Sequence, residues 1–345
     1  DAPFVRRVYL DIIGGLPTPE EYSRFMVSTL ANKRELLVDE LLDRKEFAEL
    51  WVLKWAELLQ IRSSNEVSYK AMLLYYGWLQ EKIAKNVPTD VWVQELLGAN
   101  GGTFKNPATN YYQLERDVLK VTENVAQVFM GMRIQCAQCH NHPFDRWTMD
   151  DYYGFAAFFA GVNLKRGVEG REVVVTNNNA ANTTAHPVDG RRMKPKFLGG
   201  NAPEIEGQDP RKALAKWLTA DDNAAFRETM ANVIWSHFFG RGIVDPVDDV
   251  RISNPPSNKE LLAAIGSKLA EHKFDKKKLV RDICNSRTYQ LAATTNKTNE
   301  LDEIYFSHSY VRRLRAEVLL DTITRITGTE DRFALSPPGT RAVQI

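Results

Sequence analysis

Glu115-Arg-Asp-Val-Leu-Lys-Val-Thr-Glu-Asn-Val-Ala-Gln-Val-Phe-Met-Gly-Met132 leads directly into Cys136-Ala-Gln-Cys-His140, which holds two of the three cysteines of the chain. Apolar residues recur at helical spacing along the first segment, and we expect them to form its buried side. They are Val121, Val125, Val128, Phe129 and Met132. The segment therefore predicts a long helix whose C-terminal end leads into Cys136.

The same apolar spacing recurs through most of the chain on both sides of this helix. Thr18-Pro-Glu-Glu21, Thr148-Met-Asp-Asp151 and Ser257-Asn-Lys-Glu260 resemble capping boxes, which start helices. Gly240 and Gly328 are typical of helix ends. We therefore predict a mainly α protein with further helices over residues 18–30, 33–44, 47–59, 69–84, 88–98, 148–159, 211–219, 224–239, 257–272, 276–286 and 311–327.

The composition changes after Gly161, which suggests how the chain is divided. Glu172-Val-Val-Val-Thr176 is typical of a β-strand. Asn177–Glu206 is polar and broken by proline and glycine, as in a long loop. We therefore expect a multi-helix domain carrying the CxxCH motif over residues 1–162, a short β/loop linker or insertion over 163–207, and a second helical domain, possibly truncated, over 208–345.

Charge and hydropathy exclude some classes of partner. The 345 residues include 45 Lys and Arg against 44 Asp and Glu, so the net charge is +1 and no nucleic-acid partner is expected. No apolar run is long enough for a transmembrane segment. The chain opens at Asp1 without a signal peptide, so we expect either a cytoplasmic protein or an exported chain that has lost its signal.

Cys136 and Cys139, with His140 directly after them, have the spacing that attaches c-type haem. Two thiols add to the two vinyl groups at one edge of the porphyrin, and the histidine then reaches the iron as its proximal ligand. The motif predicts a c-type haem protein in electron transfer or haem-based redox chemistry, with a redox partner protein. Cys284 lies on an apolar helical stripe and is expected to be a buried hydrophobe.

Several features around the motif leave its chemistry open. Seven aromatic residues follow it and fit either the apolar wall of a haem pocket or an ordinary core; they are Phe144, Trp147, Tyr152, Tyr153, Phe155, Phe158 and Phe159. His142 is too close to His140 to be the second axial ligand. The candidates for that ligand are Met132, Met149, His186, His237, His272 and His308, and a five-coordinate iron is equally allowed.

Other chemistries also use these residues. Cys136, Cys139, His140 and His142 could hold Zn or an Fe ion in an extracellular binding or assembly protein, with Asp145 nearby. The cysteines could instead be a thiol–disulfide pair, although the preceding helix is unlike the usual strand, or they could be purely structural. Whether the protein is an enzyme stays open, and no catalytic residue is assigned.

A third hypothesis is an enzyme acting on an extracellular polymer. The long loop Asn177–Glu206 would then line part of a cleft, and Asp245, Asp248 and Asp249 would supply carboxylates. A solvated acidic turn explains the three aspartates equally well.

The chain also resembles a known family. Phe4–Glu21, Gln135–Trp147 and Asp151–Tyr153 resemble motifs of the planctomycete cytochrome-c-like domain of unknown function. The second half resembles the planctomycete-specific domain that usually follows it, through Pro195–Gly200, Phe239–Asp249, Asn254–Ser257 and Ile283–Gln290. The resemblance implies an exported protein of the periplasm or cell surface, and it implies no activity for the second domain.

Overall fold

Helices are the main regular structure of the molecule, as the apolar spacing predicted. The computed structural model describes residues 1–205, 207–329, 331–334 and 336–344. Within these residues the chain forms 14 α-helices, five short strands and three 3₁₀ helices. No helix in this part of the chain is long and apolar enough to span a bilayer.

Nine α-helices precede the second strand and build the first half of the molecule. They are α1 (Ala2–Ile13), α2 (Pro19–Val27), α3 (Lys33–Leu42), α4 (Lys45–Leu58), α5 (Tyr69–Ala84), α6 (Thr89–Leu97), α7 (Asn110–Leu114), α8 (Val118–Met130) and α9 (Met149–Ala156). The capping boxes at Thr18 and Thr148 are confirmed. The predicted helix over 115–132 is shorter than expected, because the Asp117 side chain caps α8 by accepting from the Leu119 N–H and Gly131 ends it.

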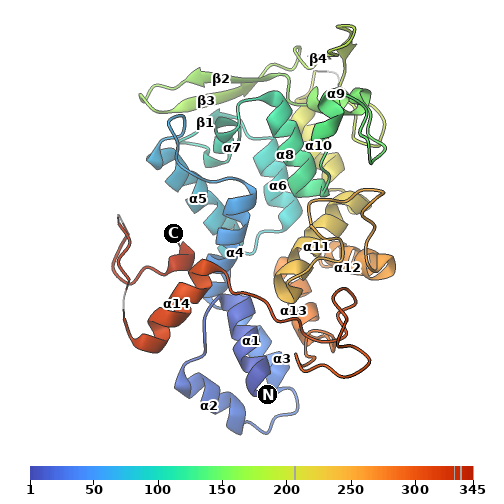
Figure 1. The fold of residues 1–345 in the computed structure, drawn as a ribbon. Helices are drawn as coiled ribbons and strands as arrows, with labels where there is room; N and C mark the ends of the chain where they lie inside the picture. Colours follow the sequence, from blue (N-terminus) through green and yellow to red (C-terminus); the bar gives the residue numbers. More distant parts are fainter. Residues whose placement is uncertain (206, 330, 335, 345) are drawn as a thin grey trace.

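The strands gather at one end of the molecule, opposite α1 to α3 (Figure 1). β1 (Gly101–Gly102) and β2 (Val162–Arg166) pair antiparallel with the two edges of β3 (Val173–Asn177), which confirms the strand predicted at 172–176. The segment predicted as one long loop contains a small hairpin of β4 (Thr184–Ala185) and β5 (Arg192–Met193). Glu206, the end of that predicted loop, lies outside the described residues.

Five α-helices form the second half: α10 (Pro210–Leu218), α11 (Ala224–Phe239), α12 (Lys259–Glu271), α13 (Lys276–Asn285) and α14 (Ala316–Thr327). The third predicted capping box is wrong, because Asn258 rather than Ser257 caps α12 by accepting from the Leu261 N–H. α14 begins five residues later than residue 311, where its helix was predicted to start.

The two halves pack on each other through helices that are far apart in sequence. α11 lies against α8, α10 against α6 and α13 against α3, and one buried apolar cluster runs through both halves. The Asp11 side chain of α1 accepts from the Tyr289 hydroxyl at 2.9 Å and pairs with Arg312. The first half is therefore anchored to the second by apolar packing and by buried polar contacts, while the domain boundaries at 162 and 207 stay predictions.

Three 3₁₀ helices complete the structure: η1 (Pro107–Thr109), η2 (Gln135–Gln138) and η3 (Ala342–Gln344). η2 begins the CxxCH motif and packs against α9. The motif is therefore held between the end of α8 and the start of α9.

Candidate functional site

A left-handed glycine positions the chain that enters the motif. Gly131 ends α8 with φ of 68°, a conformation that side chains disfavour. A Cβ here would lie 2.9 Å from atoms of both Thr229 and Val250, so the close approach of the second half also requires glycine. The Val250 N–H donates to the Gly131 carbonyl at 2.7 Å, and Asp248 pairs with Arg133 at 2.7 Å. The second half of the chain therefore fixes the path toward Cys136.

The motif forms a short 3₁₀ turn with exposed thiols. The backbone N–H groups of Cys139 and His140 both approach the Cys136 carbonyl at 3.4 Å. Side chains three residues apart in such a turn lie nearly one above the other. Cys136 and Cys139 are unpaired and exposed, and Ala137 between them is fully buried. Ala137 therefore packs the turn against the core, and both thiols face solvent.

The imidazole of His140 has a defined orientation. Its Nδ1 lies 2.8 Å from the carbonyl oxygen of Asn141. A carbonyl oxygen can only accept, so Nδ1 carries the proton and Nε2 keeps its lone pair in the neutral ring. The Asn141 side chain accepts from the Met149 N–H at 3.2 Å, which ties the same residue to the first turn of α9.

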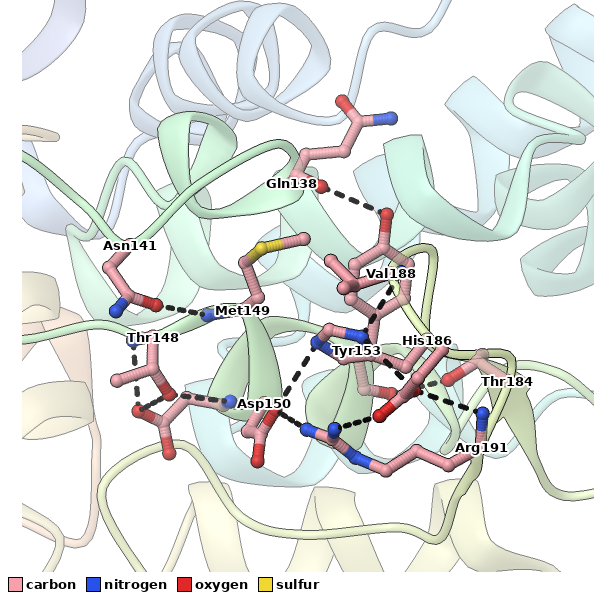
Figure 2. A network of polar contacts seen from close by, with 12 residues as sticks. Gln138, Asn141, Thr148, Met149, Asp150, Tyr153, Thr184, His186, Val188 and Arg191 are labelled. Atoms are coloured by element: carbon pink, nitrogen blue, oxygen red, sulfur yellow. Dashed lines mark hydrogen bonds and ion pairs between the residues drawn. The ribbon is translucent and has the colours of Figure 1, made fainter.

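Residues in the first turns of α9 support the motif through a hydrogen bond. The Tyr153 hydroxyl donates to the Gln138 carbonyl at 3.0 Å (Figure 2). Burial and the neighbouring Cys139 raise the pKa of Tyr153, so the hydroxyl stays a donor at neutral pH. The Thr148 and Asp151 capping box fixes where the helix starts. The Tyr153 contact connects two segments 15 residues apart, and its partner could not be read from the sequence.

The β4–β5 hairpin holds α9 from its other side (Figure 2). The Thr184 hydroxyl donates to the Tyr153 carbonyl at 2.7 Å. The buried ring of His186 packs edge-on against Tyr153 and lies 3.3 Å from an Asp150 oxygen. Arg191 pairs with Asp150, which completes the contact between hairpin and helix. This hairpin lies within the segment predicted as a loop, so no sequence signal identified its role.

Three of the six candidates for a second axial ligand are engaged elsewhere. His237 Nε2 bonds the Asp11 carbonyl at 2.7 Å, and burial together with the nearby charge of Lys54 lowers the pKa of His237 to about 3. His272 Nε2 lies 2.6 Å from Asp282, and His308 lies in the loop before α14 with Nε2 3.1 Å from a main-chain carbonyl.

The other three candidates lie in segments near the motif. Met132 is buried in the core just before η2. Met149 and His186 belong to the helix and hairpin that support the motif. His186 Nδ1 already accepts from the Val188 N–H at 3.3 Å. One nitrogen of the His186 ring is therefore occupied, while the other lies 3.3 Å from Asp150.

The aromatic residues after the motif serve mainly as core. Phe144 is 62% exposed, whereas six others are buried within the main apolar cluster: Trp147, Tyr152, Tyr153, Phe155, Phe158 and Phe159. Their burial explains them without a haem pocket. The donor set of the motif fits a covalently attached haem, but these side chains do not form an exposed apolar wall beside it.

The four residues predicted as an alternative ion site are not gathered around one point. Among the described residues, no group of three or more His, Cys, Asp or Glu side chains could hold a metal ion. His142 Nδ1 accepts from the Phe144 N–H at 3.2 Å, and Asp145 accepts from the Arg146 N–H at 2.8 Å. Binding of Zn or Fe by Cys136, Cys139, His140 and His142 would require these side chains to move.

The three aspartates after Gly240 have structural partners. Asp248 accepts from Gln127 at 2.5 Å, and Asp249 lies 3.2 Å from Arg251. Asp245 accepts from the Gly242 N–H at 3.3 Å. These contacts account for the carboxylates as parts of a turn that packs against the end of α8.

Comparisons with known proteins identify the organisation of the chain. No curated protein and no solved structure matches it. Residues 1–164 match the family PSCyt2, described as Protein of unknown function (DUF1549). Residues 210–342 match the family PSD1, described as Protein of unknown function (DUF1553). The chain therefore carries the planctomycete cytochrome-c-like domain of unknown function, PSCyt2, followed by the PSD1 domain of unknown function.

Proposed function

We propose that the chain is a c-type haem protein that acts in electron transfer or haem-based redox chemistry. Cys136 and Cys139 would hold the haem through thioether bonds, and His140 would be its proximal ligand. The observation that carries this proposal is the orientation of His140, whose Nδ1–H is bound by the Asn141 carbonyl while Nε2 keeps its lone pair. Haem bound there would supply an iron that takes up and releases one electron.

Hydrogen bonds from neighbouring residues hold the motif in position. A hydrogen bond to the far nitrogen of a ligating histidine fixes its ring and raises its basicity. Asn141 makes that bond and is itself tied to α9 through Met149. Tyr153 holds the Gln138 carbonyl, so the turn that carries both thiols is braced at its centre.

Exposure of the motif supports transfer of electrons to a redox partner protein. Cys136, Cys139 and His140 are all exposed, so a group attached to them is accessible from the surface of this chain. A substrate pocket at the motif is not needed for that activity. We further propose an exported protein of the periplasm or cell surface, which rests on the family resemblance alone.

The first experiment is a pyridine haemochrome spectrum of the chain exported through a host with c-type haem maturation. We expect an α-band typical of two thioether links and haem that survives acid–acetone extraction. Cys136→Ala with Cys139→Ala should abolish covalent haem. His140→Ala should keep attached haem with an altered Soret band.

Two variants serve as matched controls. Cys284→Ala removes a fully buried cysteine, and His142→Ala removes the neighbouring histidine, so both should retain the wild-type haem spectrum. No haem in the wild type, despite maturation of a control cytochrome in the same cells, would refute the proposal. A colourless protein with stoichiometric zinc lost in the cysteine variants would instead support the alternative of a structural metal at the motif.

A further inference from the structure

A polar groove lies between β3 and the start of α10. Its first part is a cleft of about 590 Å³ whose walls include Asn100, Asn177, Asn179, Gln208, Asp209 and Lys212. An adjoining cleft of about 850 Å³ shares Asn179 and Gln208 with the first, so the two form one continuous groove. Both volumes lie within or near the range of small-molecule sites.

A buried arginine holds one wall of this groove. Arg211 is fully buried and donates to Asp209 at 2.7 Å, to the Asn100 side-chain oxygen at 2.7 Å and to the Ala99 carbonyl at 3.1 Å. Its guanidinium lies 5.0 Å from the ring centre of Tyr112. Burial by itself would raise the pKa of Asp209, but the hydrogen bond and the positive charge of Arg211 lower this pKa. Asp209 is therefore ionised at neutral pH, and its two oxygens are held in one position by Arg211 and Asn100.

Amide groups line the opposite wall. The Asn177 amide donates to the Asn179 side chain at 2.7 Å, and the Asn179 amide reaches across to the Gly207 carbonyl at 3.2 Å. Within the described part of the chain, no hydrogen bond or ion pair engages the side chains of Gln208 and Lys212. These two exposed side chains supply donors and an acceptor to whatever enters the groove.

The balance of charge excludes some ligands. Asp209 is neutralised by Arg211, and Glu204 offsets Lys194 in the second cleft, so among the described lining residues Lys212 adds the remaining charge. A polyanion such as nucleic acid therefore meets a single lysine rather than a basic patch. Addition of a peptide strand is also disfavoured, because β3 extends only two residues, Thr176 and Asn177, past Val175, its last pairing with β1.

We infer that this groove binds a neutral oligosaccharide. Sugar hydroxyls each donate and accept, and the amides of Asn179 and Gln208 together with the Lys212 ammonium match that pattern along an open channel. Pro195, Pro203 and Ile205 add apolar surface in the second cleft for the faces of sugar rings. The inference is independent of haem, because none of these residues belongs to the motif or its supports.

Isothermal titration of the purified chain with cellohexaose, maltohexaose and laminarihexaose tests the inference. We expect at least one of these neutral probes to bind. Gln208→Ala and Lys212→Ala should each weaken that binding about three- to ten-fold, the size expected for the loss of one hydrogen bond. The double variant should lose measurable binding while its circular dichroism stays that of the wild type.

Matched surface variants control for nonspecific effects. Lys278→Ala removes an exposed helical lysine from α13, and Asn65→Ala removes an exposed amide from another loop, so neither should change the affinity. Three results would overturn the inference: no binding of any neutral probe, binding that Gln208→Ala and Lys212→Ala leave unchanged, or binding only of hexagalacturonate or of a blocked peptide of alternating Thr and Lys.

Discussion

Replacing the buried Arg211 with methionine should destabilise the protein far more than its loss of packing volume explains. Arg211 has 0% exposure, and its Asp209 partner is 10% exposed. Methionine fills similar space but removes the guanidinium that donates to Asp209, to the Asn100 side chain and to the Ala99 carbonyl. Breaking one partner of a buried ion pair costs about 3–5 kcal/mol, a large share of the roughly 5–15 kcal/mol that stabilises a typical domain.

Urea unfolding measured by circular dichroism checks this value. The change in midpoint, multiplied by the unfolding slope, gives the change in free energy when the slope is unchanged. Lys85→Met is the matched control, because its ion pair with Glu81 is 68% and 59% exposed. That variant should leave the midpoint where it is.

A double-mutant cycle separates charge from packing. Asp209→Asn alone should also destabilise, because it leaves Arg211 buried without its counter-charge. The double variant Asp209→Asn with Arg211→Met should cost clearly less than the sum of the two single changes. Additive costs, or a loss below about 1 kcal/mol for Arg211→Met, would refute the view that this buried pair holds β1, α10 and the groove together.

Three further predictions concern other parts of the molecule. The folded pKa of His237, about 3, lies below the ordinary value of 6.5, so the unfolded chain binds the extra proton. Stability should therefore fall as pH drops from 6.5 toward 3, and His237→Gln should flatten that part of a plot of urea midpoint against pH. Thr148→Ala should cost about 1 kcal/mol in urea unfolding through loss of the α9 cap; no change would show that the cap is redundant. Tyr153→Phe should keep covalent haem but shift its reduction potential, because the Gln138 carbonyl loses its donor; an unchanged potential in spectroelectrochemistry would contradict this support role.

Local signals predicted twelve of the 14 α-helices of the described residues because such signals depend on neighbours in sequence, whereas α1 and α7 were not predicted. Thr18 and Thr148 each met a carboxylate three residues later, and both capping boxes formed. The signal at Ser257 was ambiguous, since Asn258 is an equally good cap and lies one residue further on. The β4–β5 hairpin was missed because strands of two residues are too short for a period to be visible.

The sequence alone determined the residues of the candidate site and the mainly helical class. Cys136, Cys139 and His140 are adjacent, so their spacing is a property of the chain before it folds. The helical class follows from apolar periodicity, which is equally local.

Only the tertiary structure decided what surrounds these residues. It exposed the two thiols, directed His140 Nδ1 to a carbonyl, and brought Tyr153 under the motif. It also placed Asn100 beside Asp209 through Arg211, although more than one hundred residues separate them. Such contacts depend on which helix faces pack together, and a linear pattern does not specify the partner of a buried face.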